Sequence, residues 1–78
     1  MNFLKEKIQK YNEKKLKDAL KKMKFHTDAK KQLEIQLKIA TDYESKIEIK
    51  EKIEHHDEFI NIWKKNIEVI NKQSKKLE

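Results

Sequence analysis

Residues 49–77 read IKEKIEHHDEFINIWKKNIEVINKQSKKL, and their pattern decides the fold. Within this stretch, mostly apolar side chains recur at alternating steps of four and three residues. This is the spacing with which one face of an α-helix packs against a neighbouring helix. The stretch therefore predicts a long helix with a heptad seam. The seam residues are Ile49, Ile53, His56, Ile60, Trp63, Ile67, Ile70, Ser74 and Leu77.

The composition favours helix and excludes several kinds of site. The sequence holds no Gly, Pro or Cys, while the strong helix formers Lys, Glu, Leu and Gln are abundant. Phosphate-cradling loops and nucleophile elbows depend on Gly, because only Gly adopts their backbone angles at low cost. A disulfide-stapled secreted scaffold is excluded by the absence of Cys. We therefore expect residues 1–78 to form a single all-α domain.

Two further helices are expected before the seam. Apolar residues within one half of a helical wheel predict a first helix near residues 2–25. Thr27 and Asp28 are residue types that cap helix N-termini, so a second helix is expected near residues 28–41. Its apolar positions cover more than half of its circumference, so it should be the most enclosed helix. The apolar residues of the first helix are Leu4, Ile8, Tyr11, Leu16, Ala19, Leu20 and Met23.

A break is expected between the second helix and the seam, near residues 42–45. The apolar arc of residues 29–43 points nearly opposite to that of residues 49–77, and two capping boxes overlap here, Thr41 with Glu44 and Ser45 with Glu48. The third helix would then run near residues 44–76. The expected fold is a small three-helix bundle with a long C-terminal helix. The alternative is a helical hairpin with one long continuous second helix.

The third helix would be about 48 Å long at about 1.5 Å per residue, more than twice the length of the second. The far end of the seam, Ile67, Ile70 and Leu77, would then lack an intramolecular neighbour. Apolar residues beyond the seam, such as Ile62 and Val69, extend the surface to be covered. We therefore expect self-association, most simply as an antiparallel homodimer. The predicted partner-binding residues are Phe59, Ile62, Trp63, Ile67, Val69 and Ile70.

Basic charge is concentrated in the first helix. The net charge is +6, with twenty basic residues that are all Lys, a usage typical of A+T-rich genomes and thus of a low-GC bacterium, phage or plasmid. The stripe either keeps a small protein in solution or contacts phosphates. Because Arg is absent, such nucleic-acid binding would have little sequence specificity. The basic stripe consists of Lys7, Lys10, Lys14, Lys17, Lys21 and Lys24.

An acidic stripe and two histidines are the candidate metal-binding or titratable groups. The stripe lacks the Glu-x-x-His spacing of di-iron bundles, so neither a metal nor a cofactor is expected. His56 lies on the seam, either as a core-edge histidine that is hydrogen-bonded to a neighbour or points its polar end outward, or as a pH-sensitive marker of register. His26 is expected to serve local structure beside the first cap. The acidic stripe comprises Glu44, Glu48, Glu51, His55 and Glu58.

The functional expectation is binding without catalysis. Ser45 is a predicted cap and Ser74 a seam residue near a helix end, so an activated nucleophile is not expected, nor is a small-molecule substrate. No run of eighteen apolar residues predicts a membrane span, and a cytoplasmic protein is expected. The sequence favours a non-enzymatic, protein-binding regulator or inhibitor that acts through its helical surface. The alternative is a helical dimer that binds nucleic acid through the phosphate backbone.

Overall fold

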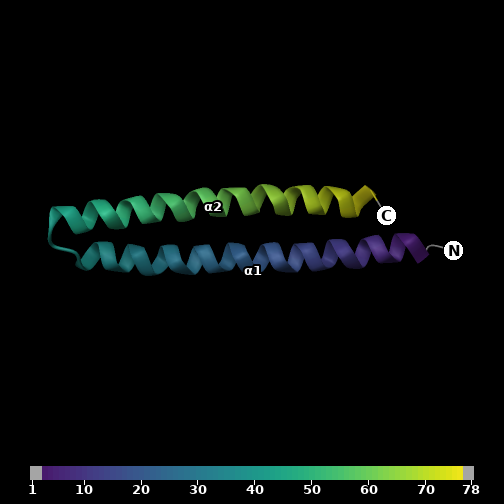
Figure 1. Cartoon of the computed structure of the whole chain (residues 1–78), viewed down its shortest axis with the longest axis horizontal. Helices are drawn as coiled ribbons and strands as arrows, with labels where there is room; N and C mark the ends of the chain where they lie inside the picture. The colour runs from purple at the N-terminus through teal and green to yellow at the C-terminus, as the bar shows by residue number, and fades with distance from the viewer. Residues whose placement is uncertain (1–2, 77–78) are drawn as a thin grey trace.

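The computed structural model describes residues 3–76, which form two antiparallel helices (Figure 1). Helix α1 (Phe3–Ile39) and helix α2 (Tyr43–Lys76) lie side by side, with both chain ends at the same end of the molecule. The principal extents are 64 × 14 × 12 Å, so the fold is an extended helical hairpin. The all-α prediction is confirmed, whereas the three-helix bundle is wrong.

Both helices contribute a heptad seam to their contact. On α2 the predicted seam residues from Ile49 to Ser74 are half-buried or buried, which confirms the seam within the described residues. Leu77 lies outside those residues. On α1 the matching line also follows alternating steps of four and three, the spacing typical of an antiparallel coiled coil. It consists of Lys5, Gln9, Asn12, Leu16, Ala19, Met23, His26, Lys30, Leu33 and Leu37, and Ala40 just beyond α1 continues it.

The chain reverses direction at residues 40–42, close to the break predicted near residues 42–45. The Asp42 carboxylate accepts a hydrogen bond from the backbone N–H of Ser45 at 3.0 Å and caps the start of α2. The cap is therefore Asp42 rather than Thr41 or Ser45. Hydrogen bonds from the Ser45 side chain, and then from its backbone, lower the pKa of Asp42. An ionised carboxylate is thus favoured where the N–H groups of α2 are unpaired.

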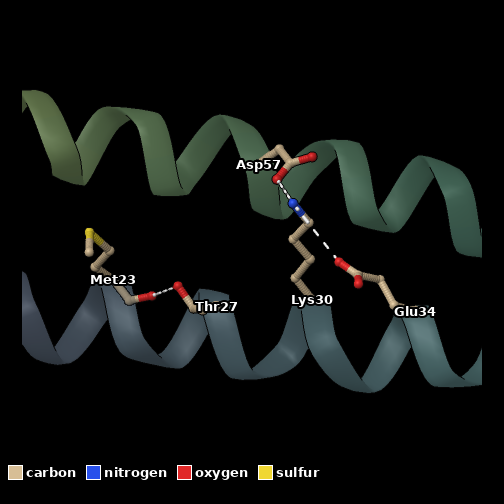
Figure 2. A network of polar contacts seen from close by, with 5 residues as sticks. All are labelled: Met23, Thr27, Lys30, Glu34 and Asp57. Atoms are coloured by element: carbon tan, nitrogen blue, oxygen red, sulfur yellow. Dashed lines mark hydrogen bonds and ion pairs between the residues drawn. The ribbon is translucent and has the colours of Figure 1, made fainter.

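The break expected at residues 25–28 does not occur, because α1 continues through it. The Thr27 hydroxyl donates to the backbone oxygen of Met23 at 2.8 Å, so it is satisfied within the helix and caps nothing (Figure 2). The seam of α1 also passes through this region without a change of phase, and α2 covers both sides of it. The alternative hairpin had the right outline but placed its turn about fifteen residues too early.

Because α1 spans both the first and the second predicted helix, two further expectations are wrong. Residues 28–39 are not the most enclosed part of the chain, since Ile35 and Ile39 are 51% and 72% exposed. The end of the α2 seam is not uncovered either. Helix α1 is long enough to cover it, and Ile70 is only 7% exposed.

Little of the hairpin is deeply buried. Among residues 3–76 the buried side chains are Ala19, Ile70 and the polar Asn12, and no large side chain is fully buried. Two helices enclose only a line of residues between them, so the side chains that flank the seam remain partly exposed. The surface beside the seam therefore determines what else the molecule can bind.

Candidate protein-binding face

The predicted partner-binding residues occupy two different places on α2. Trp63, Ile67 and Ile70 lie on the seam and face α1. Phe59, Ile62 and Val69 lie beside the seam and are exposed, with Ile62 and Val69 each 52% exposed. Only the second group is accessible to another molecule in this hairpin.

Helix α1 places a matching set of apolar side chains on the same side. Each of these residues, like those on α2, immediately precedes a seam residue. Leu4, Ile8 and Tyr11 were expected to form the core of the first helix, but they are exposed, at 71%, 39% and 60%. We call this surface the apolar face. It consists of Leu4, Ile8, Tyr11 and Phe25 of α1 and Phe59, Ile62 and Val69 of α2.

Contacts between the helices show that these two sets share one side. A cavity beside the seam is lined by Lys15 and Asp18 of α1 together with Asn66 and Val69 of α2, all of which precede seam residues. The ring of His26 also stacks on Phe59 across the helices, with centroids 4.7 Å apart and planes at 10°. Sequence analysis missed the contribution of α1 because it assigned Leu4, Ile8 and Tyr11 to the core.

The opposite side of the hairpin is almost entirely polar. On that side lie the residues that immediately follow each seam residue. Among the residues that directly follow the seam residues 5 to 26 of α1 and 56 to 74 of α2, Leu20 is the single apolar one. Apolar residues are sparser on the same side near the turn, where Gln32, Gln36 and Lys52 alternate with Ala29 and Ile39. The asymmetry makes the side that carries the apolar face the candidate binding surface.

The cavity lies in the middle of the apolar face and has a volume of about 270 Å³. Its floor includes Ala19, whose small side chain leaves space opposite the large ring of Trp63. Its rim is formed by Lys15, Asp18, Asn66, Val69 and Gln73. An apolar floor with a polar rim is suited to receive a side chain from another helix.

Lysine stems shield part of the aromatic surface. The Lys22 ammonium lies 4.7 Å from the centre of the Trp63 ring, and the Lys15 ammonium lies 5.1 Å from that of Tyr11. Long lysine side chains cover apolar surface while their charged ends remain in water. Because the Lys15 side chain can move aside, Tyr11, which is 60% exposed, remains accessible to a partner.

Two histidines meet across the seam at mid-length. The Nδ1 atoms of His26 and His56 lie 2.9 Å apart, so one nitrogen donates and the other accepts. Burial, and then the neighbouring His56, lower the pKa of His26. The hydrogen-bonded role expected for His56 is confirmed. The local role expected for His26 is wrong, because its ring also contacts Phe25 and Phe59.

An ion pair joins the two helices beside the histidines. The Lys30 ammonium lies 2.6 Å from the Asp57 carboxylate on α2 and 3.9 Å from the Glu34 carboxylate one turn along α1 (Figure 2). The hydrogen bond to Asp57 is the main cause of the raised pKa of Lys30. The pair and the histidines together indicate which residues of α1 and α2 stand opposite each other.

The two charged stripes lie on the outer surface. All six lysines of the basic stripe are exposed on the side of α1 directed away from α2. The acidic stripe residues on α2, from Glu44 to Glu58, are exposed as well. Within residues 3–76, no group of three or more His, Cys, Asp or Glu side chains is placed to hold a metal ion.

Comparison with protein-family models, curated proteins and solved structures finds no match to this chain. In the described part of the chain, neither helix combines the length and the apolar character needed to cross a membrane.

Proposed function

We propose that this protein is a non-enzymatic regulator or inhibitor that acts by binding another protein chain through the apolar face. The observation that carries the proposal is the concentration of exposed apolar side chains on one side of the hairpin, around a cavity with an apolar floor. Exposed apolar side chains gathered on one side of a small protein mark candidate interaction sites. The cytoplasm of a low-GC bacterium, or of a cell that carries its phage or plasmid, is the proposed setting.

Binding rather than turnover is favoured by what surrounds the cavity. In the described part of the chain, its lining includes no His, Ser or Cys, and the Lys15 and Asp18 side chains lie at its open rim. The Ser45 backbone is engaged in the cap of α2, and Ser74 lies on the seam. Stoichiometric docking requires only shape, apolar area and a polar rim, all of which the face supplies.

The experiment is affinity capture with three forms of the immobilised protein. The wild type is compared with Ile62→Glu, which places a charge on the apolar face, and with Asn61→Glu, a matched control on the opposite side. The proposal expects a protein retained by the wild type and the control but lost with Ile62→Glu, and then reconstituted from purified components. The proposal fails if no protein other than the chain itself distinguishes Ile62→Glu from the control.

Nucleic-acid binding is the second candidate, and the basic stripe is the observation that favours it. Six exposed lysines follow the outer surface of α1 over about 25 Å at about 1.5 Å per residue, a length that can follow a phosphate backbone. The affinity should fall steeply with salt and depend little on base sequence. The stripe is separate from the apolar face, so the two functions can be tested independently.

Fluorescence anisotropy with short DNA and RNA duplexes at low salt tests this candidate. Replacing Lys10, Lys14, Lys17 and Lys21 with Gln should weaken binding about equally on every duplex. The control is Ile62→Glu, which leaves the stripe intact. Anisotropy that stays flat with the wild type would remove this candidate and leave the protein-binding function standing.

A further inference from the structure

The hairpin lacks the usual means by which a small fold becomes stable. Its buried apolar side chains within residues 3–76 are Ala19 and Ile70. The sequence has no Cys for a disulfide, and the described residues offer no metal-binding cluster. Small scaffolds without those supports generally gain stability by oligomerisation, which enlarges the core. The apolar face is the surface through which this hairpin can do so.

We propose that a second copy of this chain covers the apolar face and forms an antiparallel four-helix bundle. Helix α1 of one copy lies on α1 of the other, and α2 lies on α2. The two-fold axis runs across both helices, level with the midpoint between Lys15 and Asp18. This proposal rests on the proposed function because both use the apolar face. It identifies the partner on that face as a second copy of the chain.

Charge complementarity fixes this position of the axis. Lys15 and Asp18 both line the cavity at the centre of the face, and no ion pair joins them within the described hairpin. A two-fold axis level with their midpoint places each Lys15 opposite Asp18 of the second copy, so two ion pairs form. In an alternative dimer, α1 of one copy would lie on α2 of the other at the same level. Lys15 would then face Asn66 of the second copy and have no charged partner.

The same axis matches the apolar side chains of α1 with one another. Residues equally far from the midpoint of positions 15 and 18 meet across the interface. Ile8 therefore meets Phe25 of the second copy, and Tyr11 meets Lys22, a pairing that favours a cation–π contact. Each of these exposed side chains of α1 then has a partner of suitable chemistry.

Helix α2 follows from the same alignment. His26 stands opposite His56, and the cavity places Lys15, Asp18 and Asn66 at one level of the hairpin. Asn66 thus lies close to the axis and meets Asn66 of the second copy. Ile62 and Val69, which lie on either side of that level, meet each other.

The area of the face is sufficient for a stable dimer. The face runs from Leu4 to Phe25, which is about 32 Å along α1. Two helices side by side are about 20 Å wide, which gives about 640 Å² of projected area for each copy. Side-chain relief increases this toward the roughly 800 Å² per partner of a standard stable interface.

Cysteine cross-linking in the full chain tests the arrangement. The sequence has no native Cys, so Asn66→Cys introduces one thiol near the proposed axis, and Asn61→Cys introduces a matched thiol on the opposite side. Under mild oxidation we expect Asn66→Cys to form a disulfide-linked dimer at least tenfold faster than Asn61→Cys. Equal rates, or faster linkage of Asn61→Cys, would overturn the proposal.

A charge swap provides a second, independent measurement. Lys15→Glu and Asp18→Lys should each weaken dimerisation by about fivefold or more, because each places like charges opposite one another twice. The double variant restores both pairs and should recover most of the wild-type affinity. Additive losses in the double variant would overturn the proposed axis. A monomeric chain that still binds a foreign protein through Ile62 would overturn this inference alone, whereas a failure of both would overturn the proposed function too.

Discussion

Ile70 is the large apolar side chain best protected by the hairpin, so its truncation measures how much the seam stabilises the fold. It is 7% exposed and lies beside the cavity on the side of α2 that faces α1. Ile70→Ala removes three buried carbons, which is about 2.4 kcal/mol at about 0.8 kcal/mol per carbon. The helix propensity of Ala returns about 0.4 kcal/mol. The cavity is open to water, so relaxation of a new void adds little. The expected loss is about 2 kcal/mol.

Thermal and urea unfolding, followed by circular dichroism at 222 nm and at fixed protein concentration, measure this loss. For a chain of this size, about 2 kcal/mol lowers Tm by about 8 °C or more. Ile35→Ala is the matched control, because Ile35 is 51% exposed on the outer side of α1. Its stability should stay within about 0.5 kcal/mol of the wild type. Equal losses at the two positions would refute the seam and the burial on which it rests.

Three other predictions concern polar groups. Because the pKa of His26 is lowered from 6.5, the unfolded chain takes up a proton that the hairpin resists, so Tm should fall as the pH drops from about 7 to 5. His26→Gln should flatten that dependence and His55→Gln should not, as thermal melts across this range will show. Asn12→Leu should stabilise the hairpin by about 1 kcal/mol in urea unfolding, since a buried polar seam residue sets register at a cost in stability. Asp42→Ala should lower Tm at pH 7 but not near pH 2, because the lowered pKa of Asp42 gives stability that is lost as the carboxylate is protonated.

The sequence predicted local features of the fold correctly but predicted one helix too many. The α2 seam and the break after residue 39 could be predicted because heptad spacing and cap residues are local signals. The false break at residues 25–28 arose because Thr27 and Asp28 resemble a cap. Inside a helix that packs along its whole length, the Thr27 hydroxyl simply bonds back to Met23.

The candidate site was predicted in part. Phe59, Ile62 and Val69 could be recognised because they lie beside a regular seam on α2. The contribution of α1 could not, since its seam contains Lys5, Gln9 and Asn12, and the apolar residues beside it give the stronger helical pattern. Helix α1 therefore carries two lines of residues, the seam and the apolar residues beside it. Only the pairing with α2 shows that the seam is the line that is covered.

The central claim is that the apolar face binds a protein chain and that a second copy of this chain is its first partner. The solution mass of the chain tests this claim most directly. Light scattering across a concentration series should give twice the chain mass of 9.5 kDa for the wild type. It should give one chain mass for Ile62→Glu and twice the chain mass for Asn61→Glu. A monomer at every wild-type concentration, or a dimer insensitive to Ile62→Glu, would contradict the proposed dimer.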